Sequence, residues 1–308
     1  MKKSFRKTLE RIAGCQVLFD EPLAGHTSLG VGGPAMAVVY PDRRECLEAT
    51  LAFLDSEGIS CLPIGNGTNL IVRDGGYRGV VICLQRLAGV GIMPDLTGGA
   101  ALLTAEAGAS LAELVTLSAA AGFAGLEFCA GIPGSVGGAV AMNAGAYGRE
   151  IKDVLAELTI MDRRGEISRW DRTQLQFSYR RFASPVENGL IVAAAFRLTP
   201  DDREEIKKRI SEIKSIRRRK HPLEYRSAGS VFKNPPGQPA GKLIEEAGLK
   251  GLKNGAAQIS EKHGNFIVNR GGATAKEILD LIAFIQERVF LEKGIRLETE
   301  VITVGEES

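Results

Sequence analysis

The sequence has little that would support a metal site, a disulfide framework or a membrane span. Its five cysteines are scattered and odd in number, with no C-x-x-C pair, as expected of reduced thiols in a cytosolic protein. Its three histidines stand at no metal-ligand spacing, so we expect no metal. No run of eighteen apolar residues occurs, and the basic N-terminus lacks the apolar stretch of a signal peptide. We therefore expect a cytoplasmic protein with no membrane partner.

The sequence also lacks a large net charge and a convincing phosphate-binding motif. A net charge of +2 gives no electrostatic reason to expect nucleic acid. The P-loop pattern G-x-x-x-x-G-K-[ST] is absent. Residues 30–35 fit G-x-G-x-x-A, but they precede an expected strand instead of joining a strand to a helix. We interpret them as a false match to a Rossmann site.

The sequence is rich in glycine and alternates short apolar runs with helical patterns. It has 308 residues and 37 glycines, enough chain for two or three lobes. Hairpins and single helices favour an α+β fold over a doubly wound sheet. We expect a short N-terminal helix, a charged helix over 201–220 that bridges two domains, and further helices over 42–56, 110–121, 239–247 and 274–293. Expected strands cover 36–40, 60–65, 69–74, 79–84, 100–107, a hairpin turning at 164–165, 189–198 and 297–304.

Residues 131–148 form the most unusual stretch, here called the glycine segment. Its sequence GIPGSVGGAVAMNAGAYG has six glycines, four alanines and no charge. Glycine accepts positive φ and lets the main chain approach another surface closely. The segment therefore predicts main chain packed against a large ligand, with amide N–H groups available to bind it. Tight packing of a helix or strand against a sheet is the alternative.

A second glycine-bracketed stretch covers Ile64 to Leu70, here called loop 64–70. Between two expected strands it offers several N–H groups, with Asn and Thr side chains as further donors. Such a loop can hold a pyrophosphate without lysine. A simple hairpin turn is the alternative, because Asn-Gly is a common turn pair. Together with the glycine segment, the loop indicates a dinucleotide.

Three other parts of the sequence contain candidate functional residues. Residues 225–235 put hydroxyls, a lysine and an amide around Gly229, which suggests either a proton donor beside a substrate clamp or a capped turn. Tyr179-Arg180 and Glu300 could be functional, structural or solvent-facing. The run 217–221, RRRKH, is the solvated end of the bridging helix or, as a minority option, a phosphate site.

Taken in order, these segments resemble the UDP-N-acetylenolpyruvoylglucosamine reductase family. The matching pieces are HTSLGVGGPA, LPIGNGTNLIVRDGGYRGVVI, GIPGSVGGAVAMNAGAYG, FSYRRF, SAGSVFKNP, AGLKG, HGNFIVN and LETEV. They run from His26 to Val301 in a single order. The short link before the bridging helix suggests the family's compact subtype, which lacks a tyrosine-bearing loop over the substrate.

The resemblance implies a fold, a cofactor and a reaction. The fold would be a flavin-binding α+β region of the vanillyl-alcohol-oxidase type followed by a C-terminal α+β substrate domain. We expect an N-terminal helix in 1–24, an FAD-binding region of two lobes over 25–200 that divides near 84–100, and the substrate domain over 201–308. NADPH would reduce non-covalent FAD, and flavin N5 would then pass a hydride to UDP-N-acetylglucosamine enolpyruvate, giving UDP-N-acetylmuramate. A monomer is expected.

The resemblance also implies roles for single residues. Arg180 and its acidic partner Glu300 would stabilise the enolate-like species at the substrate carboxylate, and Ser230 would donate the proton. Substrate contacts would come from Tyr179, Lys233, Asn234 and Asn265. FAD contacts would come from Gly65, Asn66, Gly67, Thr68, Asn69, Leu70, Gly131, Ile132, Pro133, Gly134, Ser135, Gly137, Gly138, Ala139 and Asn143. Phe182 departs from the family, which often has a small hydroxyl residue there.

Two alternatives stay open at this point. One is another FAD-dependent oxidoreductase of the same fold acting on a sugar or alcohol, although His26 is the only histidine before the bridging helix that could attach a flavin covalently. The other is a non-enzymatic nucleotide-binding module, in which Arg180, Ser230 and Glu300 would have no reason to act together.

Overall fold

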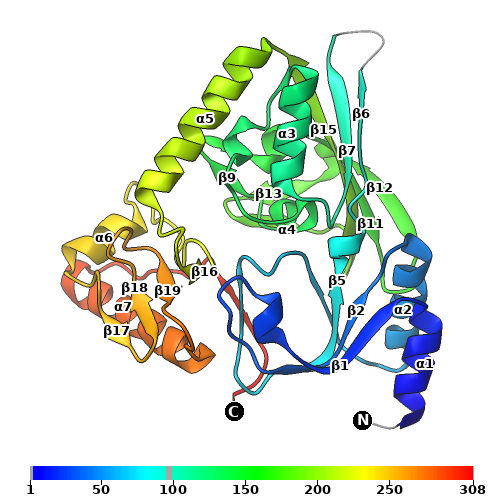
Figure 1. Ribbon diagram of the computed structural model, residues 1–308, viewed down its shortest axis with the longest axis horizontal. Coiled ribbons are helices and arrows are strands. Elements are labelled where there is room, and N and C mark those ends of the chain that lie inside the picture. The colour runs from blue at the N-terminus through cyan, green and yellow to red at the C-terminus, as the bar shows by residue number, and fades with distance from the viewer. Residues whose placement is uncertain (1–2, 95–98, 308) are drawn as a thin grey trace. The chain divides into compact units, whose positions relative to one another are not determined.

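The protein consists of two compact units, each assembled from segments that are distant in the sequence (Figure 1). The computed structural model describes residues 3–94 and 99–307. Unit 1 contains Met1–Phe19, Ala37–Asn66 and Gly79–Ile216, and unit 2 contains Asp20–Met36, Gly67–Arg78 and Arg217–Ser308. The expected division of the flavin-binding region near 84–100 stays a prediction, and residues 95–98 within it lie outside the described part.

The first half of unit 1 pairs two helices with a four-stranded sheet. Its strands follow the order β1-β2-β5-β3, with β3 parallel to β5. Helices α1 and α2 pack on each other, and their buried side chains join the core of the unit. The elements are α1 (Lys3–Ala13), β1 (Gln16–Pro22), β2 (Pro34–Tyr40), α2 (Arg44–Ser56), β3 (Cys61–Ile64), β5 (Tyr77–Cys83) and η2 (Leu84–Arg86). The short helix η1 (Leu23–His26) follows β1 and belongs to unit 2.

An antiparallel sheet dominates the second half of unit 1. Its strands follow the order β12-β11-β15-β7-β6, and β8 pairs with the end of β15. The first part of the long central strand β15 is buried, whereas Arg197, Thr199 and Pro200 near its end are exposed. The strands are β6 (Val90–Pro94), β7 (Ala101–Glu106), β8 (Phe123–Ala124), β11 (Leu155–Met161), β12 (Ile167–Asp171) and β15 (Leu190–Pro200).

Short helices and hairpins connect these strands. Helix α3 lies in front of β7 and β15 in the view of Figure 1. The remaining elements of the unit are α3 (Leu111–Ala121), η3 (Glu127–Cys129), α4 (Val136–Ala141), η4 (Ile151–Asp153), η5 (Arg172–Gln174), and the hairpins β9 (Gly145–Ala146) with β10 (Arg149–Glu150) and β13 (Gln176–Ser178) with β14 (Arg181–Ala183).

Helix α5 (Arg203–Lys220) carries the chain from unit 1 into unit 2. Its first N–H groups are capped by Asp202, whose carboxylate accepts from Glu204 and Glu205. Ile206 is buried in this helix, and Ile210 and Ile213 pack at the margin of the unit 1 core. The narrow apolar stripe read from the sequence is therefore the face by which α5 joins unit 1.

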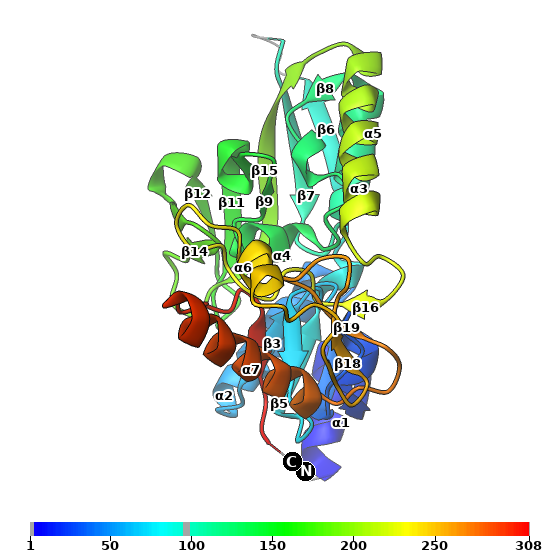
Figure 2. The same ribbon diagram turned by 90° about the vertical axis from the view of Figure 1, so that its left-hand side faces the viewer.

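Unit 2 combines a small antiparallel sheet with two helices and a parallel strand pair (Figure 2). The sheet order is β16-β19-β18-β17, and α7 packs on β17 and β18. Strands β4 and β20 pair in parallel. The elements are β4 (Leu70–Val72), β16 (Arg226–Ser227), α6 (Ala240–Glu246), β17 (Lys253–Asn254), β18 (Ala257–Ile259), β19 (Ile267–Asn269), α7 (Ala275–Lys293) and β20 (Ile302–Val304).

Local signals placed several elements correctly. The Ser110 hydroxyl caps α3 by accepting the N–H of Ala112, and Thr274 with Glu277 forms a capping box at the start of α7. The expected strand over 297–304 is partly wrong, because the only strand there is β20. Its first half makes an isolated bridge from Thr299 to Phe232. Cross-strand partners, and not alternation, decide which of these residues form a ladder.

Candidate functional site

In unit 1, the first part of loop 64–70 packs against the start of α4. A Cβ atom at Gly65 would lie 2.0 Å from the hydroxyl oxygen of Ser135, so only glycine allows this approach. Ser135 is the N-cap of α4, and its Oγ accepts the N–H of Gly138 at 3.4 Å. The Asn66 amide oxygen accepts a hydrogen bond from Gln85 at 3.2 Å. The structure thus brings Gly65 and Asn66 to the same unit as the glycine segment, and Gly65 into contact with it.

The glycine segment packs closely at one position and offers main-chain N–H groups at others. At Gly137 it makes a tight crossing, because the N–H donates to the carbonyl of Ala107 at 2.8 Å and an added Cβ would lie 2.9 Å from the Cβ of Ala107. Packing, the alternative interpretation, is therefore real at this position. The main-chain N–H groups of Gly131, Gly134 and Ser135 have no hydrogen-bond acceptor among residues 3–94 and 99–307. Successive N–H groups of this kind suit an anion.

This local structure fits the pyrophosphate of a dinucleotide. Gly131 and Gly134 have φ of 75° and 146°, which turns their N–H groups in ways that L side chains rarely allow. Ala139 is buried in the core of unit 1, and Ile132 is half-buried at its margin. Loop 64–70 is not a hairpin turn, since β3 pairs with β5 and β4 with β20.

Asn143 is engaged by protein groups on three sides. It is fully buried, and its Nδ2 donates to the Glu150 carboxylate at 2.9 Å and to the carbonyl of Ser178 at 3.1 Å. Its Oδ1 accepts the N–H of Lys152 at 3.1 Å. The residue expected to contact FAD therefore ties the end of the glycine segment to the residue that precedes Tyr179.

Tyr179 and Arg180 form the two-residue turn of the β13–β14 hairpin. Arg180 has φ of 56°, an uncommon conformation for a non-glycine residue and one that is often found at functional sites. Its guanidinium lies 5.1 Å from the ring centroid of Tyr179. Phe182 stacks on Phe177 across the hairpin, with ring centroids 4.9 Å apart. The departure from the family at this position is therefore compatible with a firmly held turn.

In unit 2, the second part of loop 64–70 is joined to Glu300. The Nδ2 of Asn69 donates to the carbonyl of Glu300 at 3.0 Å, and Leu70 is the register partner of Ile302 in the β4–β20 pair. The Ser28 N–H donates to the carbonyl of Gly67 at 3.1 Å. A Cβ at Gly67 would lie 2.1 Å from the carbonyl of His26, which makes glycine necessary at this position of the loop.

Ser230 and Glu300 lie on adjacent stretches of main chain in unit 2. The N–H of Glu300 donates to the carbonyl of Val231 at 2.8 Å, and Lys233 donates its N–H to the carbonyl of Glu298 at 2.9 Å. The bridge from Phe232 to Thr299 belongs to the same antiparallel arrangement. The structure therefore places the segments of Ser230 and Glu300 side by side, and Asn69 joins loop 64–70 to them.

The expected substrate contacts of unit 2 have different surroundings. The Lys233 Nζ lies 3.2 Å from the Glu298 carboxylate, on an exposed surface. Asn234 accepts the N–H of Ala240 at 2.9 Å. Asn265 is 3 % exposed, and its amide pairs with both main-chain groups of Phe232, accepting its N–H at 2.9 Å and donating to its carbonyl at 2.8 Å. Asn265 thus supports the segment that contains Ser230.

The sequence does not single out Ser28 or Asp74, although both stand in motifs shared with the family. The Ser28 hydroxyl, in HTSLG, donates to the carbonyl of Ser227 at 2.7 Å. Asp74, in VRDGG, accepts the N–H groups of Ala275 and Lys276 at 2.9 Å each and so caps α7. The sequence does not show these contacts, because each side chain binds a main-chain group more than 190 residues away.

Four cysteines outside these sets have raised thiol pKa values. Burial raises the pKa of the Cys15 thiol to about 11 and also raises the pKa of Cys46, Cys61 and Cys83, so these thiols stay protonated. Among residues 3–94 and 99–307, no cluster of three or more His, Cys, Asp or Glu side chains could hold a metal. No helix in the described part of the chain is long and apolar enough to cross a membrane.

Comparison with known proteins first defines the class. Residues 35–171 match the profile of an FAD binding domain, and residues 221–304 match that of the UDP-N-acetylenolpyruvoylglucosamine reductase C-terminal domain. The chain is thus a flavoprotein oxidoreductase with a distinct C-terminal domain. These matches confirm an FAD-binding region followed by a distinct C-terminal domain, and both regions mix helices and strands as expected of an α+β fold. The vanillyl-alcohol-oxidase type of the flavin-binding region stays a prediction.

Full-length relatives then identify the family. The chain is 52% identical over 301 residues to UDP-N-acetylenolpyruvoylglucosamine reductase of Syntrophus aciditrophicus, covering 97% of this chain and 96% of the relative. It is 43% identical to the enzyme of that name from Carboxydothermus hydrogenoformans, with 99% of both chains covered. The crystal structure of UDP-N-acetylenolpyruvylglucosamine reductase from Thermus caldophilus is similar at a TM-score of 0.78 and 37% identity, covering 94% of this chain and 98% of that one. The chain belongs to the UDP-N-acetylenolpyruvoylglucosamine reductase family.

Proposed function

We propose that this chain catalyses the NADPH-dependent, FAD-mediated reduction of UDP-N-acetylglucosamine enolpyruvate to UDP-N-acetylmuramate in peptidoglycan precursor synthesis. Family membership over nearly the whole chain supports an FAD-dependent reductase of this substrate. The observation that carries the proposal is the group in unit 2, where the loop expected to bind FAD, Ser230 and Glu300 are held by main-chain and amide hydrogen bonds. In a non-enzymatic nucleotide-binding module, Ser230 and Glu300 would have no reason to lie beside this loop.

FAD would be held, without a covalent bond, by the main chain of loop 64–70 and of the glycine segment. The N–H groups of Gly134 and Ser135 bind the pyrophosphate, and the absence of side chains at Gly65 and Gly137 keeps the supporting main chain close. Bound FAD supplies hydride transfer from NADPH to the enolpyruvyl group. Asn143 holds the end of the glycine segment in place through its hydrogen bonds to Glu150, Lys152 and Ser178.

Ser230 would donate the proton that completes the reduced product. A serine hydroxyl is a weak acid, so it protonates only a strongly basic carbon and only when held in place. The two hydrogen bonds between Asn265 and Phe232 hold the segment two residues beyond Ser230. Asn265 is in this proposal a positioning residue, whereas Tyr179, Lys233 and Asn234 are the substrate contacts.

Arg180 and Glu300 would stabilise the charge that develops on the substrate carboxylate. An arginine guanidinium offers a planar set of donors suited to a carboxylate, and preorganised charge is most effective where charge appears in the transition state. The αL conformation of Arg180 and the stacked pair Phe177–Phe182 fix the turn that presents this guanidinium. We also propose that the protein is a cytoplasmic monomer and that its reaction serves cell shape and cell division.

The role of Glu300 is tested by Glu300→Gln, which keeps the size of the side chain and removes its charge. We expect NADPH to reduce the bound flavin at a rate within about twofold of the parent, while reoxidation by the enolpyruvyl substrate slows about tenfold or more. Stopped-flow absorbance of the flavin separates the two half-reactions. The matched control is Glu287→Gln, at an exposed position of α7. Reoxidation at the parent's rate would show that Glu300 has a structural role only.

A further inference from the structure

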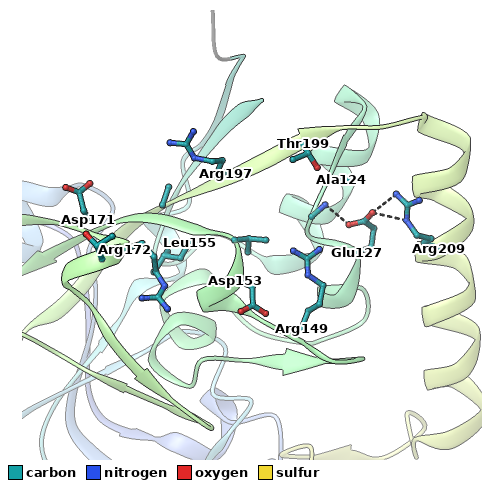
Figure 3. A pocket seen from close by; sticks show the side chains of 14 residues that line it. Ala124, Glu127, Arg149, Asp153, Leu155, Asp171, Arg172, Arg197, Thr199 and Arg209 are labelled. Atoms are coloured by element: carbon teal, nitrogen blue, oxygen red, sulfur yellow. Dashed lines mark hydrogen bonds and ion pairs between the residues drawn. The ribbon is translucent and has the colours of Figure 1, made fainter. Parts of the chain in front are cut away.

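Unit 1 contains a solvent-open cavity of about 710 Å³ to which no expected FAD or substrate contact contributes (Figure 3). One apolar wall of the cavity consists of Val154, Leu155 and Ala156, at the junction of η4 and β11. Ala124 and Gly125 line it as well. Its volume lies within the range of about 300–1,000 Å³ that is common for small-molecule sites. The size admits an organic molecule as large as a nucleotide.

Four arginines line the cavity, namely Arg149, Arg172, Arg197 and Arg209. Arg149 rises between Asp153 and Glu127, and Arg172 and Arg197 stand on the other side (Figure 3). Across residues 3–94 and 99–307, none of these three guanidiniums is paired with a carboxylate. Arginine stays charged at every physiological pH, so this positive charge is permanent.

Arg172 is the fixed member of this group. Its Nε donates to the carbonyl of Lys152 at 2.9 Å and its Nη1 to the carbonyl of Leu175 at 3.1 Å. The guanidinium also lies 5.1 Å from the ring centroid of Phe177. Carbonyl groups and a ring position this charge without neutralising it. Arg149 is similarly placed over the ring of Phe128, at 5.6 Å, and Arg197 makes no such contact within the described residues.

The carboxylates of the cavity are already engaged. Glu127 accepts from Arg209 at 2.8 Å and from the N–H of Gly125 at 2.6 Å. Burial alone would raise the pKa of Glu127, but these hydrogen bonds outweigh it and the pKa is lowered, so the Glu127–Arg209 pair stays charged and mutually neutral. Asp153 and Asp171 accept main-chain N–H groups in the capping boxes of η4 and η5. Within the described part of the chain, three arginines without a carboxylate partner stand against two turn-capping carboxylates, so the lining of the cavity is net positive.

We propose that this cavity is a second ligand site, which binds an organic phosphate of nucleotide size. Arg172 and Arg197 bind the phosphate group, and the organic part extends along Val154–Ala156 toward Arg149. Charge-assisted hydrogen bonds from a guanidinium to phosphate are among the strongest that a solvent-open site can make. The lining residues are distinct from the proposed FAD and substrate contacts.

Titration of the FAD-containing protein with adenosine 5′-monophosphate, followed by calorimetry, tests the proposal. We expect saturable binding that Arg149→Ala with Arg197→Ala weakens about tenfold or more. The matched control is Arg164→Ala with Arg169→Ala, which removes the same charge from exposed positions of unit 1 outside the cavity and should leave binding within about twofold. Adenosine, which has no phosphate, should bind at least about tenfold more weakly.

Three results would overturn the proposal. The first is an absence of saturable binding of adenosine 5′-monophosphate to the parent protein. The second is an equal effect of the two double variants, which would place the nucleotide elsewhere or reduce its binding to general charge. The third is binding of inorganic phosphate as tight as that of the nucleotide, which would remove the role of the organic part. Unchanged thermal midpoints of both double variants show that each one is folded.

Discussion

Amide side chains, of which Asn143 and Asn265 are buried and Asn69 is half-buried, organise both parts of the proposed site. Asn143, Asn265 and Asn69 each use their side chains to fix main chain beside a residue with a proposed chemical role, namely Arg180, Ser230 and Glu300. An amide can donate and accept at once, so that one buried asparagine satisfies two or more main-chain groups. A buried main-chain group left without a partner would otherwise destabilise the fold.

At the residue scale, Ser230→Ala tests the proton donor. We expect NADPH to reduce the flavin normally, while turnover of the enolpyruvyl sugar nucleotide is abolished, because the alanine side chain has no proton to give. Anaerobic flavin reduction and steady-state turnover are measured on the same preparation. The control Ser227→Ala lies in β16, three residues earlier, and should keep turnover within about twofold. Normal turnover of Ser230→Ala would remove the donor role.

The sequence identified candidate residues better than it identified their partners. Arg180, Ser230 and Glu300 stand in recognisable motifs, whereas the bonds of Asn143 to Ser178 and of Asn69 to Glu300 join positions 35 and 231 residues apart. Asn143 and Asn265 were expected to contact FAD and substrate because they lie in the same motifs. Residue type and spacing show that an amide is present, but only the fold shows whether the protein already satisfies it.

At the scale of elements, helices were predicted more accurately than strands. Thr274 and Glu277 mark the start of α7, and Ser110 marks the start of α3, because caps are local signals. The hairpins β9–β10 and β13–β14 were not predicted. Their strands have only two or three residues, too few for alternation to be seen. The β13–β14 turn that presents Arg180 is therefore a feature that only the structure shows.

Asp74→Ala tests how unit 2 holds the start of α7. The Asp74 carboxylate accepts two N–H groups of the first helical turn, and we expect its loss to lower the free energy of unfolding by about 1–2 kcal/mol. Urea denaturation followed by circular dichroism gives the value. Asp280→Asn, in an exposed ion pair on the same helix, should cost less than about 0.5 kcal/mol. Equal effects of the two variants would contradict the capping role.

At the scale of the whole molecule, the order of segments along the chain conceals how they are grouped. Unit 2 takes Asp20–Met36 and Gly67–Arg78 from the first quarter of the chain and adds them to the C-terminal residues. The parallel pair of β4 with β20 joins residues about 230 positions apart, as the register of Leu70 with Ile302 shows. No periodicity or turn signal reports such pairing, because it depends on long-range contacts.

The stability of the molecule should depend on the cluster of His221, His263 and Phe266 in unit 2. Burial, with the nearby charge of Arg217, lowers the pKa of His221 to about 4, and burial also lowers the pKa of His263. The unfolded chain binds these protons near pH 6.5. Between pH 6.5 and 4 the unfolded state therefore holds more protons, and the free energy of unfolding falls as the pH falls.

His221→Phe separates this effect from that of carboxylates. The phenyl ring keeps an aromatic group in the cluster but cannot titrate, so we expect a shallower loss of stability between pH 6.5 and 5. Urea denaturation of both proteins at several pH values gives the two slopes. Phe284→Leu, a change at an exposed position of α7 that carries no titratable group, serves as the control and should leave the slope of the parent unchanged. Parallel slopes for His221→Phe and the parent would contradict the account.

The reaction itself is tested most directly by NADPH oxidation with and without the enolpyruvyl sugar nucleotide. The purified protein should be yellow from bound FAD and should consume NADPH in proportion to the UDP-N-acetylglucosamine enolpyruvate supplied, with UDP-N-acetylmuramate formed one for one. Another flavin oxidoreductase would be yellow but would consume NADPH without regard to this substrate, and a nucleotide-binding module would be colourless. NADPH oxidation that does not depend on the enolpyruvyl substrate would contradict the proposed function.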